Sequence, residues 1–169
     1  YCFFYFQGKK VLGYDQNKNL ANCNDASKKN LKNYLSQYRM MTDSINIKNG
    51  YIINLGIDFE IVVLAGFNSR TVVLTCIDKL KELMHIDNMQ FMQPIIIKDL
   101  QLELSKIDGV QSVMKFDIRN KWRTSLGYSG VKYNLEDANK GGIIYPSKDP
   151  SIFEIKYPNI DIQGRATTY

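Results

Sequence analysis

The stretch from Tyr51 to Leu64 constrains the fold more than any other part of the sequence, because its apolar and polar residues alternate. One set of alternate positions is apolar throughout: Ile53, Leu55, Ile57, Phe59, Ile61 and Val63. The positions between them hold Asn54, Gly56, Asp58 and Glu60. Since successive side chains of a strand point to opposite faces, the pattern predicts a long strand with one buried face and one solvated face.

Two helices are predicted after this strand. Apolar residues repeat at helical spacing from Val72 to Met84, and Asn68 or Ser69 can cap the first turn. A shorter helix is predicted over residues 98–107. Gly109 is well placed to end it in the left-handed conformation, which glycine adopts without steric cost.

Further strands complete the central layer. We predict one around Phe91 that reaches Pro94, and a last one from Val110 to Ile118. A short strand over residues 45–47, followed by an Asn-Gly turn, is predicted to form a hairpin with the long strand. The fold class is therefore α+β, with a small mixed sheet and two helices packed on one face.

An additional amphipathic helix is predicted from Lys28 to Met41, near the N-terminus. Its apolar stripe contains leucines and two tyrosines at helical spacing: Leu31, Tyr34, Leu35, Tyr38 and Met41. Lysines and Arg39 give it a basic side. The chain divides into an N-terminal strand, loop and helix (1–44), the central layer (45–119) and a C-terminal region (120–169).

The C-terminal region is predicted to be an irregular arm with short strands near Ile143 and from Ser151 to Tyr157. Three aromatic side chains lie in this arm, beside prolines: Tyr145, Phe153 and Tyr157. Aromatic residues with few neighbours are typical of a surface that another chain completes. The alternative is that they fold back on the central layer.

The sequence shows no arrangement typical of catalysis or metal binding. His85 is the only histidine, and Cys76 lies on the apolar stripe of its helix, which predicts a buried structural cysteine. Asp58 and Glu60 share the solvated face of a strand. We therefore predict no catalytic residue, no cofactor, no metal site and no small-molecule substrate, and the protein is not expected to be an enzyme.

Composition narrows the class of protein further. Apolar residues make up 44% of the sequence and charged residues 23%, as in a globular protein, and no apolar run is long enough to span a membrane. Three widely separated cysteines, Cys2, Cys23 and Cys76, favour a reducing compartment. The net charge of +5 permits contact with nucleic acid. The basic helix and Lys121-Trp122-Arg123 would serve such a module, although a solvated face accounts for them more simply.

Several long blocks of the sequence resemble the C-terminal part of the baseplate wedge protein of T-even-type contractile-tailed phages. These blocks are Leu31–Arg39, Ile52–Phe59, Ile61–Leu64, Ile143–Ser147 and Ile152–Asn159, with Gly164-Arg165 near the end. They occur in the same order and run over nearly all of the chain. The central layer, with Gly109-Val110 after its second helix, is similar to the wider baseplate J-like family.

The resemblance implies a structural protein of the virion, located in the tail baseplate and assembled in the host cytoplasm. It implies pairing with copies of the same protein, as a dimer and in a ring around the tail hub, and contacts with other baseplate wedge proteins. It also implies a longer chain, which fits the missing initiator Met. Nucleic acid is not an expected partner. The expected interface residues are Tyr34, Tyr38, Arg39, Tyr145, Phe153 and Tyr157.

Overall fold

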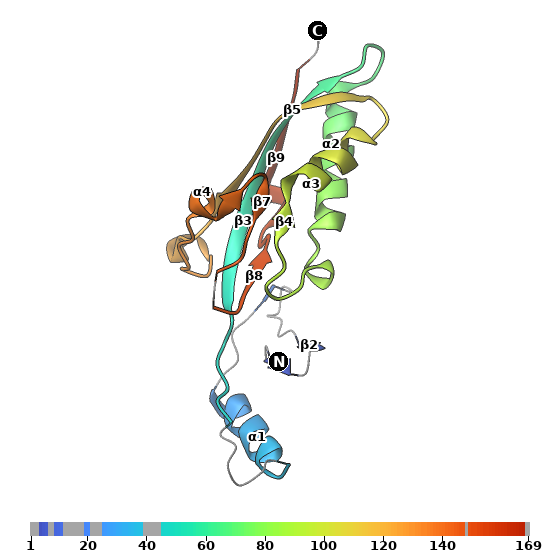
Figure 1. Ribbon diagram of the computed structural model, residues 1–169. Helices are drawn as coiled ribbons and strands as arrows, with labels where there is room; N and C mark the ends of the chain where they lie inside the picture. Colours follow the sequence, from blue (N-terminus) through green and yellow to red (C-terminus); the bar gives the residue numbers. More distant parts are fainter. Residues whose placement is uncertain are drawn as a thin grey trace. The chain divides into compact units, whose positions relative to one another are not determined.

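The computed structural model describes residues 4–6, 9–11, 19–20, 25–38, 45–147 and 149–167 (Figure 1). Tertiary contacts divide the chain into two units, residues 1–51 and residues 52–169, and each is described by itself. The described part is mixed α+β, which confirms the predicted fold class.

The first unit contains a small hairpin and one helix. Strands β1 (Phe4–Phe6) and β2 (Lys9–Val11) pair antiparallel. Helix α1 (Asp25–Ser36) begins three residues before the predicted start at Lys28, and Asp25 stands at its first position, where a carboxylate is favourable. The predicted end of this helix at Met41 lies outside the described residues. Residues 45–47 are described and form no strand, so the predicted hairpin with the long strand is wrong.

The second unit is organised around β3 (Tyr51–Val63), which has strands along both of its edges. Strand β5 (Val110–Asn120) pairs antiparallel with one edge. Strands β8 (Ser151–Glu154) and β9 (Ile162–Thr167) pair with the other edge, and β9 runs parallel to β3. The short helix α5 (Pro158–Asp161) connects β8 to β9. The C-terminal region therefore contributes two strands to the central sheet.

Helices α2 (Ser69–Leu83) and α3 (Ile97–Ser105) cover one face of this sheet (Figure 1). Helix α2 lies against β9 and α3 lies against β5. The predicted cap is confirmed, because the Asn68 side chain accepts hydrogen bonds from the amides of Arg70 and Thr71. Gly109 has a positive φ of 92°, as predicted, although it lies three residues beyond Lys106, the C-cap of α3.

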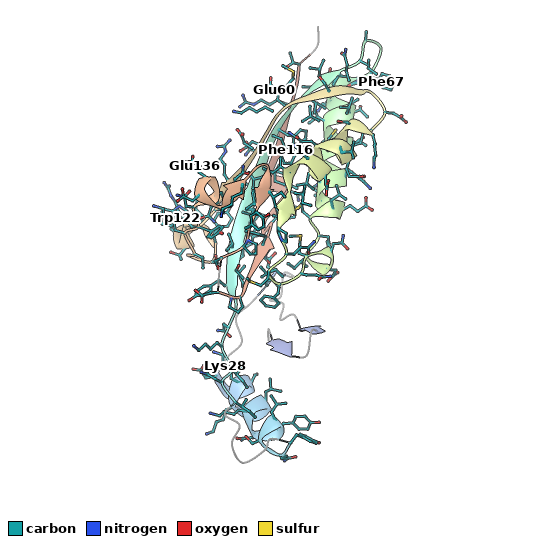
Figure 2. The ribbon with its side chains drawn as sticks, viewed as in Figure 1. Lys28, Glu60, Phe67, Phe116, Trp122 and Glu136 are labelled. Carbon is teal, nitrogen blue, oxygen red and sulfur yellow. The ribbon has the colours of Figure 1, made fainter. Side chains whose placement is uncertain are left out.

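The alternation of β3 appears directly in its burial. The six alternate apolar side chains are between 0 and 3% exposed and face the helices: Ile53, Leu55, Ile57, Phe59, Ile61 and Val63. Figure 2 shows Phe116 of β5, the partner of Phe59, between the sheet and the helical layer. Removal of this apolar surface from water is the main stabilising contribution to the sheet.

A second, smaller sheet consists of β4 (Ile95–Ile96), β7 (Ile143–Ile144) and β6 (Asn139–Lys140), in the order β4-β7-β6. The strand predicted around Phe91 and reaching Pro94 is wrong, because Phe91 lies in a turn and β4 begins after Pro94, outside the central sheet. The remaining elements are η1 (Ile86–Asn88), η2 (Thr124–Leu126) and α4 (Leu135–Ala138), and α4 contacts β5, β6 and β7.

Gly164 allows the close approach of β9 to the core. A Cβ atom at this position would lie 2.4 Å from Cζ of Phe59, a side chain that is 3% exposed and cannot move aside. We expect Gly164→Ala to lower the free energy of unfolding by about 1–3 kcal/mol, the usual cost of overpacking. Denaturant unfolding measures this change, with Arg165→Ala as the control on the exposed side of β9. Equal stabilities of the two variants would contradict this account of the contact.

Candidate protein interface

Helix α1 has an apolar face that the described structure leaves uncovered. None of its residues is buried, and Tyr34 and Tyr38 are 57% and 72% exposed. The centroids of these two rings lie 5.3 Å apart with an interplanar angle of 58°, so the tyrosines form one aromatic patch. A hydrogen bond with Tyr34 raises the pKa of Tyr38 above its usual value. Arg39, the third residue expected on this surface, lies outside the described residues.

The aromatic residues of the C-terminal region have different surroundings from one another. Tyr145 is 44% exposed. Phe153 is only 1% exposed and lies beside the ring of Tyr133, with the centroids 6.3 Å apart. Tyr157 is partly buried and contacts Tyr128 edge to face, at 5.6 Å between centroids. Phe153 is therefore a core residue and is not available to a partner, because β8 places it inside the sheet domain.

Asn54 connects three segments of the chain on the face of the sheet opposite the helices. It is fully buried, and its side-chain nitrogen donates to Oε2 of Glu154 at 2.7 Å. Its side-chain oxygen accepts from the amide of Ser129 at 2.8 Å, and its carbonyl accepts from the amide of Lys121. This end of β3 was expected to have a solvated face. The segment that follows β5 covers it instead, and hydrogen bonds satisfy the buried amide.

A second buried contact holds α5 in place. The Tyr128 hydroxyl donates to Oδ1 of Asp161 at 2.6 Å, and the amide of Tyr157 donates to Oδ2 of the same carboxylate at 3.0 Å. Asp161 is 2% exposed. Burial, followed by the hydrogen bond and the negative charge of Asp161, raises the pKa of Tyr128 well above its usual value. The buried carboxylate is thus used to connect η2 and α5.

Cys76 and His85 have the side-chain types that most often carry out catalysis, and neither has surroundings that favour it. Cys76 is buried and unpaired, and burial raises the pKa of its thiol to about 11, which disfavours the nucleophilic thiolate. The ring nitrogen Nδ1 of His85 lies 3.3 Å from a carboxylate oxygen of Asp87 on the surface. Within the described ranges, no group of three or more His, Cys, Asp or Glu residues is suitable for a metal ion.

The open face of the sheet carries charges of both signs. Asp58 pairs with Arg119 of β5, and Glu60 accepts a hydrogen bond of 2.9 Å from Thr167 of β9. Figure 2 shows Glu60 on this side, away from the helices. The neighbouring carboxylates of β3 therefore belong to cross-strand contacts, as is usual for a solvated sheet face.

Trp122 stands on the same side of the molecule, beyond the end of β5 (Figure 2). The residue is 42% exposed, and Nζ of Lys132 lies 5.7 Å from the ring centroid, within the range of a cation–π contact. One face of the indole ring is therefore occupied by a lysine of the same chain.

Only part of the predicted surface is present as one cluster. Tyr34 on α1 and Tyr38 in the turn that follows it lie together in the first unit, whereas Tyr145 belongs to the second unit. The roles of Asn54, Tyr128 and Asp161 were not predicted from the sequence. Asn54 shares the polar phase of its strand with Asp58 and Glu60, so alternation gave no sign of its burial, and no local pattern marked Tyr128 or Asp161.

Comparison with known proteins adds no family assignment. A scan against the sequence models of known protein families gave no match for this chain. A comparison with curated proteins also gave no match. Among the described residues, no helix is long and apolar enough to cross a membrane.

A substitution that removes only the hydroxyl group of Tyr128 tests its contact with Asp161. Tyr128→Phe leaves a buried carboxylate oxygen without its donor, so we expect the free energy of unfolding to fall by about 1–3 kcal/mol. Tyr145→Phe is the matched control, because this tyrosine is exposed. Urea unfolding measures both variants. A Tyr128→Phe variant as stable as the control would show that the hydroxyl has no role in holding α5.

Proposed function

We propose that this chain is a structural component of a contractile-tail baseplate wedge, which links wedges into the ring around the tail hub. The observation that carries the proposal is the apolar face of α1, a helix of 12 residues of which none is buried. Large exposed aromatic side chains on a helix are typical of contacts with another protein. The sequence blocks that resemble the baseplate wedge protein give this contact its biological setting.

The sheet domain supports a structural role rather than a catalytic one. Two contacts between buried polar side chains join segments of the same chain: Asn54 with Glu154, and Tyr128 with Asp161. A domain whose segments are held by such contacts can transmit force between its partners, because packing and hydrogen bonds fix the positions of its layers. We propose copies of the same protein and other baseplate wedge proteins as the partners, and the virion baseplate as the location.

A second candidate function is binding of single-stranded nucleic acid. The exposed indole ring of Trp122, with basic residues on either side, favours it. Against it, Lys132 already occupies one face of this ring, and acidic side chains such as Asp58 and Asp117 lie on the same sheet face. We therefore prefer the assembly function.

The proposed function can be tested in the phage that encodes the chain. We expect Tyr34→Ser combined with Tyr38→Ser to reduce the yield of complete tails, because each buried interface tyrosine contributes about tenfold or more to affinity. Electron microscopy of infected-cell lysates counts the tails. Lys29→Ser combined with Asn33→Ser is the control, since helical spacing places these residues on the opposite side of α1. A normal yield of tails from the tyrosine variant would refute the role of α1.

The two candidate functions predict different behaviour of the fluorescence of Trp122, the only tryptophan in the sequence. The assembly function predicts that a single-stranded oligonucleotide leaves the tryptophan fluorescence unchanged. Quenching that disappears as salt is added would instead support nucleic-acid binding, because contacts with phosphates weaken steeply with salt.

A further inference from the structure

In the part of the chain that the structure describes, no strand pairs with the outer edge of β5. This strand lies at the end of the four-stranded sheet, and its inner edge pairs with β3 between Leu55 and Val63. Among the described residues, no backbone hydrogen bond connects residues 111–119 to any segment other than β3. In the segment that follows, α4 packs against β5, and the amide of Tyr133 donates to the side chain of Asn120 at the end of the strand. Such an edge can pair with a further strand.

Charge alternates along the exposed side of this edge strand. Lys115, Asp117 and Arg119 follow one another on one face, and their side chains are 65%, 46% and 64% exposed. Nζ of Lys115 lies 2.9 Å from Oδ2 of Asp117 in the same strand, and Arg119 forms an ion pair with Asp58 of β3. A row of alternating sign can meet its own copy with opposite charges face to face when the two strands run antiparallel.

We propose that a second copy of this chain pairs with β5, edge to edge and antiparallel, with the two-fold axis at Phe116. In this register Lys115 of each copy lies opposite Asp117 of the other, because the contact of a two-fold dimer is reciprocal. These pairs lie on the regular side of Met114, the residue that the register with β3 skips. The two sheets then form one continuous sheet with both helical layers on the same face.

The charges select this register over its neighbours. A shift that places Asp117 opposite Asp117 of the second copy also places Lys115 opposite Arg119 of that copy, so every charged pair repels. The next shift pairs Asp117 with Arg119 but brings Lys115 opposite Lys121. The register with its axis at Phe116 is therefore the one that joins opposite charges without a repulsive pair.

Lysines and bulges on an edge strand often serve to prevent pairing. Here the register with β3 skips Gln111 and Met114, so the extra residue of each irregularity belongs to β5. They affect the first part of β5 and leave the segment from Lys115 to Arg119 regular. Its charges oppose an arbitrary strand and favour a second copy of the same strand, which gives the edge specificity.

This inference rests on the proposed function and deepens it by naming the strand through which copies meet. Mixed disulfide formation tests the register, in a chain with Cys2→Ser and Cys23→Ser. We expect Lys115→Cys protein mixed with Asp117→Cys protein to form a mixed disulfide dimer with oxidised glutathione, since opposed Cβ atoms lie about 4.5–5.5 Å apart. Either protein alone is expected to cross-link little, because its own thiols are diagonal neighbours about 7–8 Å apart.

The controls separate this register from the others. A dimer from Asp117→Cys protein alone, or from Asp117→Cys mixed with Arg119→Cys, would overturn the proposed register. No cross-link in any mixture would overturn pairing through β5. The yield of tails from the α1 variant tests the proposed function separately, so a failure here leaves that result unaffected.

Charge exchange gives a second, non-covalent test. We expect Lys115→Glu to weaken dimerisation roughly tenfold in sedimentation equilibrium, because it turns both symmetric pairs from attractive to repulsive. Adding Asp117→Lys to the same chain is expected to restore the dimer. Thermal unfolding checks that the single variant is folded, since Glu60 lies opposite position 115 within the chain. A folded double variant that stays monomeric would contradict the proposal.

Discussion

The pairing of β3 on both edges is the constraint on which the second unit depends. Strand β5 occupies one edge, and β8 and β9 share the other, so residues from the middle and the end of the chain meet on one strand. The alternation of β3 then places its apolar side chains under α2 and α3, where burial stabilises the layer. Asn54 secures the opposite face through Glu154, and Gly164 allows β9 to approach Phe59.

Local patterns in the sequence were sufficient for the elements with strong periodicity. The alternation of β3, the apolar stripe of α2 with its cap at Asn68, and the positive φ of Gly109 all follow from neighbouring residues. The position of β9 in the sheet does not follow from neighbouring residues. A polar C-terminal segment gives no local sign that it pairs parallel to β3, because that pairing depends on residues about a hundred positions away. The burial of Phe153 depends on a second long-range pairing, that of β8 with β3.

In the candidate interface, too, only the features that depend on neighbouring residues could be predicted from the sequence. Tyr34 and Tyr38 follow from helical spacing, which is local, and both are exposed. The open edge of β5 could not be derived from the sequence, since an edge is defined by strand order. Its alternating charges are visible in the sequence, but they have a meaning only once the strand is known to be at the edge. The two surfaces together fit a protein that meets more than one neighbour.

The most direct test of the assembly function is the location of the protein in tailed particles. The proposed function places this sequence in the genome of a contractile-tailed phage. Antibodies against residues 52–167, applied with gold labelling to particles of such a phage, would show the location in electron micrographs. The proposed function predicts label at the baseplate end of the tail, in several copies per particle. Label on the head, or unlabelled particles from lysates that contain the protein, would contradict it.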